Sequence, residues 1–147
     1  MILLTHLLAG AVIGTKIKAL WLAVVLSLIS HYLLDLIPHS EYSIKNIEEK
    51  LWKKSYIDFL KAGLDLCLGL SIIFLLSDNS PQIYICAFAS IIPDGLALLS
   101  RIFGFEFLKW HDCFHHDKVH KLKNKISDNG RFFAQITTIA LLAIFLF

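Results

Sequence analysis

Five long apolar runs, separated by short polar segments, constrain the fold of this chain more than any other feature. They cover residues 2–14, 19–37, 57–77, 83–103 and 132–147. A helix needs about 20 apolar residues to cross the hydrocarbon core of a bilayer, and the three central runs reach that length. Hydrophobic residues make up 56% of the 147 positions, and the mean hydropathy is +0.66. A soluble domain of this size does not bury that much apolar surface, so membrane insertion is the simpler interpretation.

We therefore expect a single all-α domain over residues 1–147. It would be a polytopic membrane helical bundle of four to five helices, with a histidine-rich loop at 104–131. The run 2–14 is too short to span a bilayer by itself, so we expect it to be interfacial, half-inserted or packed against its neighbour. No basic residue precedes it, whereas a secretory signal normally begins with positive charge, so we expect it to be retained.

Basic residues are unevenly distributed among the polar segments. One loop holds Lys45, Lys50, Lys53 and Lys54, and the other holds Arg101, Lys109, Lys118, Lys121, Lys123, Lys125 and Arg131. The turn 77–82 has no Lys or Arg. The positive-inside rule therefore predicts a multi-pass protein of the cell membrane with both basic loops in the cytoplasm. Lys16 and Lys18 lie in a tight turn on the other side and oppose this topology.

Ionisable residues inside the apolar runs fall in a regular pattern. His31, Asp35 and His39 have the spacing i, i+4, i+8, which places them on one face of a helix, and Pro38 ends or kinks that helix. A charged group at the bilayer centre costs roughly 2.5 kcal/mol or more, so such residues need partners. If the first two runs form an antiparallel hairpin, His6 returns to the same half of the membrane as His31. The pattern predicts a polar cluster at the cytoplasmic end.

Two further groups of candidate residues follow. Asp94 comes directly after Pro93, which removes a backbone donor and loosens the helix where the acid appears. Residues 111–120 contain four histidines and two aspartates. On a helix, the i, i+4 spacing of His111 and His115 would let the pair bind one metal ion, and His116 and His120 share that spacing.

Imidazole and carboxylate ligands together suit Zn²⁺, Fe²⁺ or Mn²⁺. We expect one or two divalent ions, with zinc the first candidate. Two metals about 3.5–4 Å apart can clamp both oxygens of a phosphoester during hydrolysis. The candidate ligands are His6, His31, Asp35, His39, Asp94, His111 and His116. Asp35 and Asp94 are also the candidate catalytic bases.

Three short stretches carry a resemblance to a known family. These are Thr5-His6-Leu7-Leu8-Ala9-Gly10-Ala11, Ile92-Pro93-Asp94 and His111-Asp112-Cys113-Phe114-His115-His116. They resemble motifs of the membrane-bound metal-dependent hydrolases, a helical family related to the YdjM-like inner-membrane proteins. The resemblance implies a metal-dependent hydrolase with His6, Asp94, His111 and His116 as ligands. The chain departs from the family pattern at Leu96, where a second aspartate is usual, and at Asp112-Cys113, where Arg-Gly is usual.

A second resemblance covers ten residues, Ser30 to His39. They are similar to the His-x-x-x-Asp element that supplies zinc ligands in zinc-dependent phospholipase C and the S1/P1 nucleases. This resemblance implies that His31 and Asp35 bind zinc.

Structural explanations compete with function at several positions. His6 can be a packing histidine that hydrogen-bonds a carbonyl, and His39 an exposed residue at the membrane edge. Asp65 can pair with Lys61 one helical turn earlier, and Asp94 can cap a helix that restarts after the proline. The basic loop can be a surface that touches anionic lipid. Gly63, Gly69 and Gly95 are expected to be close-packing points.

Three functions remain open from the sequence. The first is a membrane hydrolase acting on an amphiphilic substrate, such as a lipid phosphoester, at the cytoplasmic interface. The second is a non-enzymatic metal-ion binding or carrier protein, whose ligands would be spread across the membrane. The third is a haem-binding bundle, against which Asp35 beside His31 argues. Membrane lipid is the expected partner, nucleic acid is not expected, and the oligomeric state is open.

Overall fold

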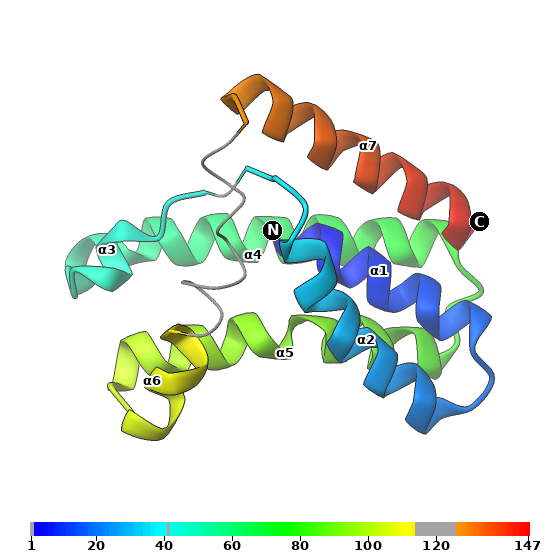
Figure 1. The fold of residues 1–147 in the computed structure, drawn as a ribbon, viewed down its shortest axis with the longest axis horizontal. Helices are drawn as coiled ribbons and strands as arrows, with labels where there is room; N and C mark the ends of the chain where they lie inside the picture. Colours follow the sequence, from blue (N-terminus) through cyan, green and yellow to red (C-terminus); the bar gives the residue numbers. More distant parts are fainter. Residues whose placement is uncertain (1, 41, 114–125) are drawn as a thin grey trace.

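The computed structural model describes residues 2–40, 42–113 and 126–147, and every regular element in these ranges is a helix (Figure 1). The helices are α1 (Leu3–Lys16), α2 (Leu20–Asp35), α3 (Lys45–Glu48), α4 (Trp52–Leu76), α5 (Pro81–Phe103), α6 (Glu106–Cys113) and α7 (Asp128–Leu146). Three of them, α4, α5 and α7, are long and apolar enough to cross a membrane. The predicted all-α, membrane-associated architecture is confirmed in that outline, whereas four to five spanning helices remain a prediction.

Some helix boundaries differ from the apolar runs. α2 ends at Asp35, before the expected residue 37, because Pro38 disfavours helical backbone in the residue that precedes it. α4 begins at Trp52 instead of residue 57, since its first turn is polar and extends the helix beyond the apolar run. A run of apolar residues therefore marks the apolar part of a helix and not where the helix begins.

The expectation of a loop over residues 104–131 is wrong at both ends of that range. It contains the helix α6, and α7 begins at Asp128 within it. Ser127 caps α7, because its hydroxyl oxygen accepts a hydrogen bond from the backbone N–H of Gly130 at 3.3 Å. Neither α6 nor the first turn of α7 belongs to an apolar run, so composition alone does not reveal them.

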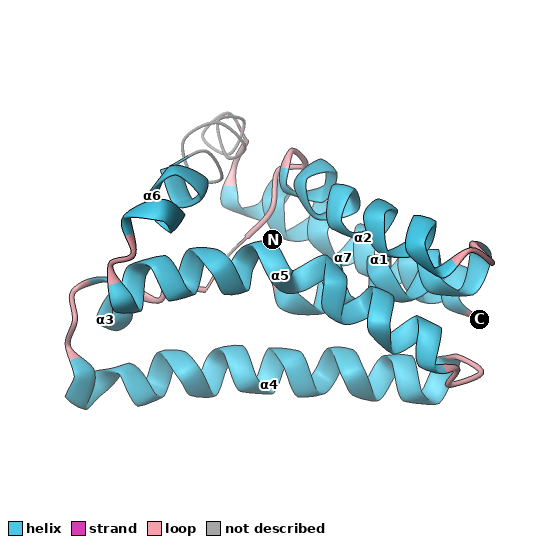
Figure 2. Ribbon diagram, turned by 90° about the horizontal axis from the view of Figure 1, so that it is seen from below, coloured by secondary structure: helices cyan, strands magenta, loops and turns pink. Residues whose placement is uncertain are grey.

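The short helix α1 lies at the centre of the bundle and packs against α2, α4, α5 and α7 (Figures 1 and 2). All of its residues from Leu4 to Ala11 are buried, unlike those of the outer helices. Of the three places expected for this run, the structure shows the one in which it packs against its neighbours.

Two glycines let the backbones of α1 and α5 approach closely. A Cβ atom added at Gly10 would lie 2.3 Å from the carbonyl oxygen of Cys86, and one added at Gly14 would lie 2.9 Å from the Cα of Ile83. Small residues spaced four apart are the usual means of close helix packing in membranes. The expectation that Gly69 is such a point is confirmed, since its added Cβ would meet Leu7 at 2.7 Å.

The expectation that Gly63 and Gly95 are close-packing points is wrong. A Cβ added at either position meets nothing within 4 Å. Both glycines lie on parts of α4 and α5 that have open space beside them.

The outer faces of α4 and α7 carry large exposed apolar side chains. Leu64, Leu75, Phe133 and Ile144 are between 62% and 75% exposed. Contiguous apolar surface of this kind marks contact with another apolar phase. It belongs to the helices that are long enough to span a membrane, so we interpret it as lipid-facing.

Polar segments gather at one end of the bundle. In Figure 1, α3 and α6 lie at this end, and the turns α1–α2 and α4–α5 lie at the other with the C-terminus. Asp58 at the start of α4 anchors α3, because its carboxylate accepts hydrogen bonds from the Asn46 side chain at 2.9 Å and the Ile47 backbone N–H at 3.2 Å.

Candidate metal centre

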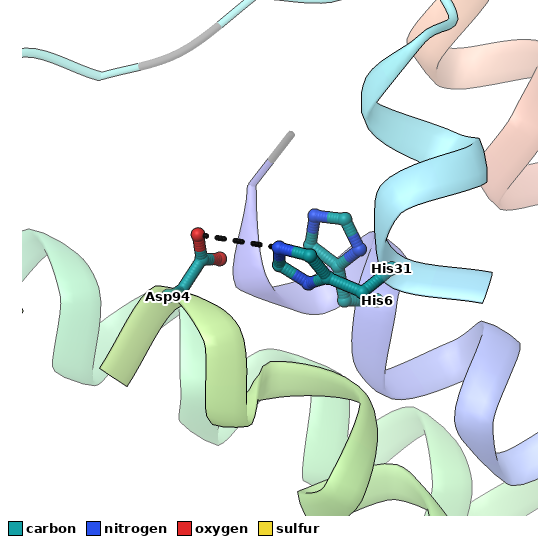
Figure 3. Close-up of side chains that lie close together, drawn as sticks. All are labelled: His6, His31 and Asp94. Carbon is teal, nitrogen blue, oxygen red and sulfur yellow. Dashed lines mark ion pairs between the residues drawn. The ribbon is translucent and has the colours of Figure 1, made fainter. Parts of the chain in front are cut away.

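Three helices each contribute one side chain to a compact cluster. His6 of α1, His31 of α2 and Asp94 of α5 each offer one ligand atom, and these atoms lie within 4.8 Å of one another (Figure 3). The two imidazole rings stack with centroids 4.1 Å apart. Both histidines are fully buried, and the Asp94 side chain is 25% exposed. The predicted return of His6 to the depth of His31 is therefore confirmed.

Asp35 lies beside both histidines. Its Oδ1 is 3.2 Å from His6 Nε2, and its Oδ2 is 3.2 Å from His31 Nε2. The same His31 nitrogen is 3.7 Å from Asp94 Oδ1. Metal–ligand bonds of about 2.0–2.2 Å in tetrahedral geometry place neighbouring ligand atoms roughly 3.3–3.6 Å apart. The spacing of these donor atoms thus fits a single small cation.

The orientation of His31 follows from its other ring nitrogen. Nδ1 lies 2.8 Å from the carbonyl oxygen of Ser90, and since a carbonyl only accepts, Nδ1 carries the proton. Nε2 then presents a lone pair toward the carboxylates of Asp35 and Asp94. A lone pair facing two carboxylates is unfavourable unless a cation or a second ring proton lies between them. Metal-binding histidines are held in the same way, by a hydrogen bond from the nitrogen that does not bind metal.

His6 lacks the hydrogen bonds that a packing histidine would make. Neither of its ring nitrogens has a hydrogen-bond partner among the described residues, and both are buried. An unsatisfied buried polar group costs about 1–3 kcal/mol. The alternative that His6 merely bonds a neighbouring carbonyl is therefore wrong, and its donor atoms remain available to a ligand beside Asp35.

Two contacts hold α1 at this depth. The carboxylate of Asp65 accepts a hydrogen bond from the backbone N–H of Leu4 at 3.3 Å, and the hydroxyl of Ser90 lies 2.6 Å from the carbonyl oxygen of His6. A carboxylate at a helix N-terminus also interacts favourably with the helix dipole. Lys61, the expected partner of Asp65, lies 3.7 Å from Asp58 instead.

His39 joins the edge of the cluster by a different route from the one expected. It does not continue the helical face of His31 and Asp35, because α2 ends at Asp35. Its Nδ1 lies 2.6 Å from the carbonyl oxygen of Ile37, and its Nε2 is 4.0 Å from Asp35 Oδ1. The side chain is 1% exposed, so the alternative of an exposed interfacial histidine is wrong.

His111 lies outside the three-residue cluster. Its Nε2 is 3.0 Å from the hydroxyl of Tyr32, whose ring packs edge-on against His31 with centroids 5.3 Å apart. A role for His111 as a ligand stays a prediction, and His116 lies outside the described residues. Sequence reasoning missed Tyr32 and Ser90, since neither carries a charge or a motif that would distinguish it.

Asp94 lies inside a continuous helix. α5 runs from Pro81 to Phe103 with Pro93 in its interior, so the alternative that Asp94 caps a restarted helix is wrong. Beside Asp94 lies a cavity of about 370 Å³. It is lined by Ile2, Leu3, Tyr42, Ser43, Ile44, Ile47, Glu48, Asp58, Phe59, Ala62, Ile91, Asp94, Gly95, Ala97, Leu98 and Arg101. The least buried acid of the cluster is thus also the one that faces open space.

Tyr42 is part of the cavity wall that the segment after α2 provides. Burial, together with the nearby carboxylates of Asp65 and Asp94, raises the pKa of the Tyr42 hydroxyl well above its usual value of 10.0. At neutral pH this hydroxyl is therefore a protonated hydrogen-bond donor.

Comparisons of the chain with protein-family models, curated proteins and solved structures found no match. The resemblance to the membrane-bound metal-dependent hydrolases therefore stays a prediction, and the functional argument rests on the geometry of the site.

Proposed function

We propose that this chain is a membrane-associated hydrolase that uses a divalent cation, with zinc the first candidate, to cleave a phosphoester in an amphiphilic substrate. The ligands would be His6, His31, Asp35 and Asp94. One observation carries the proposal. Nε2 of His31, fixed by the Nδ1 hydrogen bond to Ser90, and Nε2 of His6 each lie 3.2 Å from the buried carboxylate of Asp35.

The exposure of each acid indicates its role in the proposed site. A divalent cation in this position would supply Lewis acidity that polarises a phosphoryl oxygen and acidifies water. Asp35 is fully buried between the histidines, which suits a ligand that also orients them. Asp94 both reaches His31 and lines the cavity, so it is the acid placed to accept a proton from a molecule bound there.

We further propose that the site faces the cytoplasmic interface. Lys45 of α3, together with Arg101 and Lys109 near α6, belongs to the end of the bundle where the polar segments gather. The positive-inside rule favours the cytoplasm for that end. A substrate there can keep its apolar part in the bilayer while its head group reaches the cluster.

The second candidate function is a non-enzymatic metal-ion binding or carrier protein. It would require a path of ligands through the depth of the membrane, whereas the clustered histidines and acids lie together beside a cavity. Haem is disfavoured by a separate observation. The His6 and His31 rings stack face to face at 4.1 Å, while two axial ligands approach an iron from opposite sides.

Metal content tests the proposal directly. Wild-type protein should hold about one equivalent of zinc per cluster after reconstitution, and Asp35→Asn should lose most of it, since losing a ligand costs far more than the 10–100-fold typical of outer residues. Asp58→Asn is the matched control, because Asp58 is an equally buried acid that serves α3 instead. Elemental analysis of the three proteins gives the answer. Metal-free wild type would overturn the proposal.

Activity requires a second measurement. Zinc-loaded wild type should release head group or phosphate from a mixed lipid extract, and Asp94→Asn should release neither. Stoichiometric zinc without any release would favour the carrier.

A further inference from the structure

The cavity beside Asp94 exists because α1 is shorter than its neighbours. α1 packs against both α4 and α5, and its first residue, Leu3, forms one wall of the cavity together with the preceding Ile2. Beyond that point α4 and α5 continue toward α3, and residues of the segment 42–48 form another wall of the cavity. Asp58 holds this wall in place by its hydrogen bonds to Asn46 and Ile47. The cavity is thus a built feature of the fold.

One face of α5 gives the cavity two chemically different ends. Asp94 and Arg101 both line it and are seven positions apart, which is about 10 Å along a helix axis. Leu98 lies between them on the same face. The wall between the metal cluster and the guanidinium is therefore apolar.

Three of the polar side chains that line the cavity can donate hydrogen bonds, and the other three are acids. Tyr42 contributes a protonated phenol, Ser43 a hydroxyl and Arg101 a guanidinium. The two lining acids away from the cluster are already engaged. Asp58 accepts bonds from α3, and Glu48 pairs with Arg101 at 2.5 Å. Glu48 is also the more exposed partner of that pair, at 47% against 21% for Arg101.

We propose that this cavity binds an amphiphile with an anionic phosphate head group, and that the phosphate displaces Glu48 as the partner of Arg101. Guanidinium binds phosphate with paired charge-assisted hydrogen bonds, which suits this exchange. A volume of about 370 Å³ is small for a ligand pocket, so it holds the head group and only the first part of a chain. That the scissile bond would point toward Asp94 rests on the proposed function, whereas the binding does not.

Binding to metal-stripped protein separates this inference from the hydrolase. Dodecyl phosphate should bind to chelator-treated protein in a neutral detergent, measured by calorimetry, and Arg101→Gln should weaken binding at least about tenfold. Arg131→Gln is the matched control, since Arg131 also pairs with an acid, Asp128, and is equally 21% exposed. It should leave binding unchanged.

Glu48→Gln distinguishes a binding role from a structural ion pair. Removal of the competing carboxylate should leave dodecyl phosphate binding unchanged or make it tighter, whereas a purely structural pair would make both Glu48→Gln and Arg101→Gln bind more weakly by similar factors. Ala62→Phe should abolish binding by filling the cavity, and Ala140→Phe on the exposed side of α7 should not.

Dodecanol and inorganic phosphate complete the test. Each should bind at least about tenfold more weakly than dodecyl phosphate, because each lacks one of the two recognised parts. Equal binding of inorganic phosphate would overturn the amphiphile and leave a site for the free anion, and equal binding by Arg101→Gln would overturn the head-group site. Intact binding by a protein that never retains zinc would leave this inference standing and remove the hydrolase.

Discussion

The two halves of α1 meet α5 in different ways. In the second half, Gly10 and Gly14 bring backbone against backbone near Cys86 and Ile83. In the first half, the contact is polar, with Ser90 bonded to the carbonyl of His6. These pairs follow one antiparallel register. The half of α1 with Gly10 and Gly14 has no room to shift against α5, so it fixes the depth of the half with His6, which we call the polar half. This packing brings His6 next to His31, although the His6 ring makes no hydrogen bond to any residue that the structure describes.

The largest effect should come from the close-packed half. Gly10→Ala would place a Cβ 2.3 Å from the Cys86 carbonyl oxygen and 2.8 Å from the Ala87 Cα, atoms that cannot yield as a side chain would. We expect a loss of about 3 kcal/mol or more, or failure to accumulate as folded protein. Thermal unfolding in detergent, followed by circular dichroism, measures it.

Gly63→Ala is the matched control for this prediction. Its added Cβ meets nothing within 4 Å in α4, so removal of a helical glycine should be neutral or stabilising by up to about 1 kcal/mol. If Gly10→Ala proved as stable as Gly63→Ala, the close-packed half would not set the register.

Replacing candidate metal ligands in and near the polar half of α1 should reduce the stabilisation by zinc, by an amount that depends on the residue. A metal that binds only folded protein stabilises it by about 2.7 kcal/mol at 100 times its dissociation constant. His6→Gln should lose most of this zinc-dependent stabilisation, because His6 belongs to the cluster within 4.8 Å. His39→Gln should lose less, since its Nε2 is 4.0 Å from Asp35.

Unfolding temperatures with and without zinc measure this gradient. An equal loss of zinc-dependent stabilisation in the two variants would mean that His39 contributes to metal binding as much as His6. An unchanged zinc effect in His6→Gln would separate the polar half of α1 from metal binding altogether.

The same contrast explains how much the sequence could predict. Helix type, and the length and apolar character that would let α4, α5 and α7 span a membrane, follow from local composition, which is readable without a fold. The pairing of His31 with Asp35 follows from the i, i+4 spacing, and the approach of His6 follows from a simple hairpin. These parts depend on a single helix or on adjacent helices.

The remaining parts depend on the register between helices far apart in the chain. Ser90 holds both the ring of His31 and the backbone of His6, yet nothing in its neighbourhood distinguishes it from any helix serine. Gly10 and Gly14 set that register, whereas Gly63 and Gly95 have open space beside them, and the identity of the residue alone does not distinguish the two pairs. The cavity likewise depends on the difference in length between α1 and its neighbours.

A smaller effect is expected at the contact between α2 and α6, beside the metal cluster. Tyr32→Phe removes the hydroxyl that lies 3.0 Å from His111 Nε2, and a hydrogen bond of this kind contributes about 1 kcal/mol. The variant should unfold slightly earlier, and the amides of α6 should exchange faster with deuterium. Tyr56→Phe, an exposed tyrosine on α4, controls for the loss of a hydroxyl.

Zinc content tells what His111 does. It should be the same in Tyr32→Phe as in wild type if the tyrosine only positions α6. Loss of zinc in Tyr32→Phe would extend the polar cluster outward to His111.

The effect that is smallest at neutral pH concerns Tyr42 in the wall of the cavity beside Asp94, and it should appear only at alkaline pH. The raised pKa of Tyr42 means that the folded state favours the protonated phenol, so this contribution is complete below about pH 10 and is lost as pH rises toward the folded-state pKa. Above pH 10.0, the usual value, wild type should lose stability relative to Tyr42→Phe, by at most about 1.4 kcal/mol per pH unit. Denaturant unfolding at about pH 8, 10 and 11, below, at and above the usual tyrosine pKa, measures the difference in unfolding free energy between the two proteins. A constant difference at all three values would mean that Tyr42 is hydrated, and that the segment after α2 does not close the cavity beside Asp94.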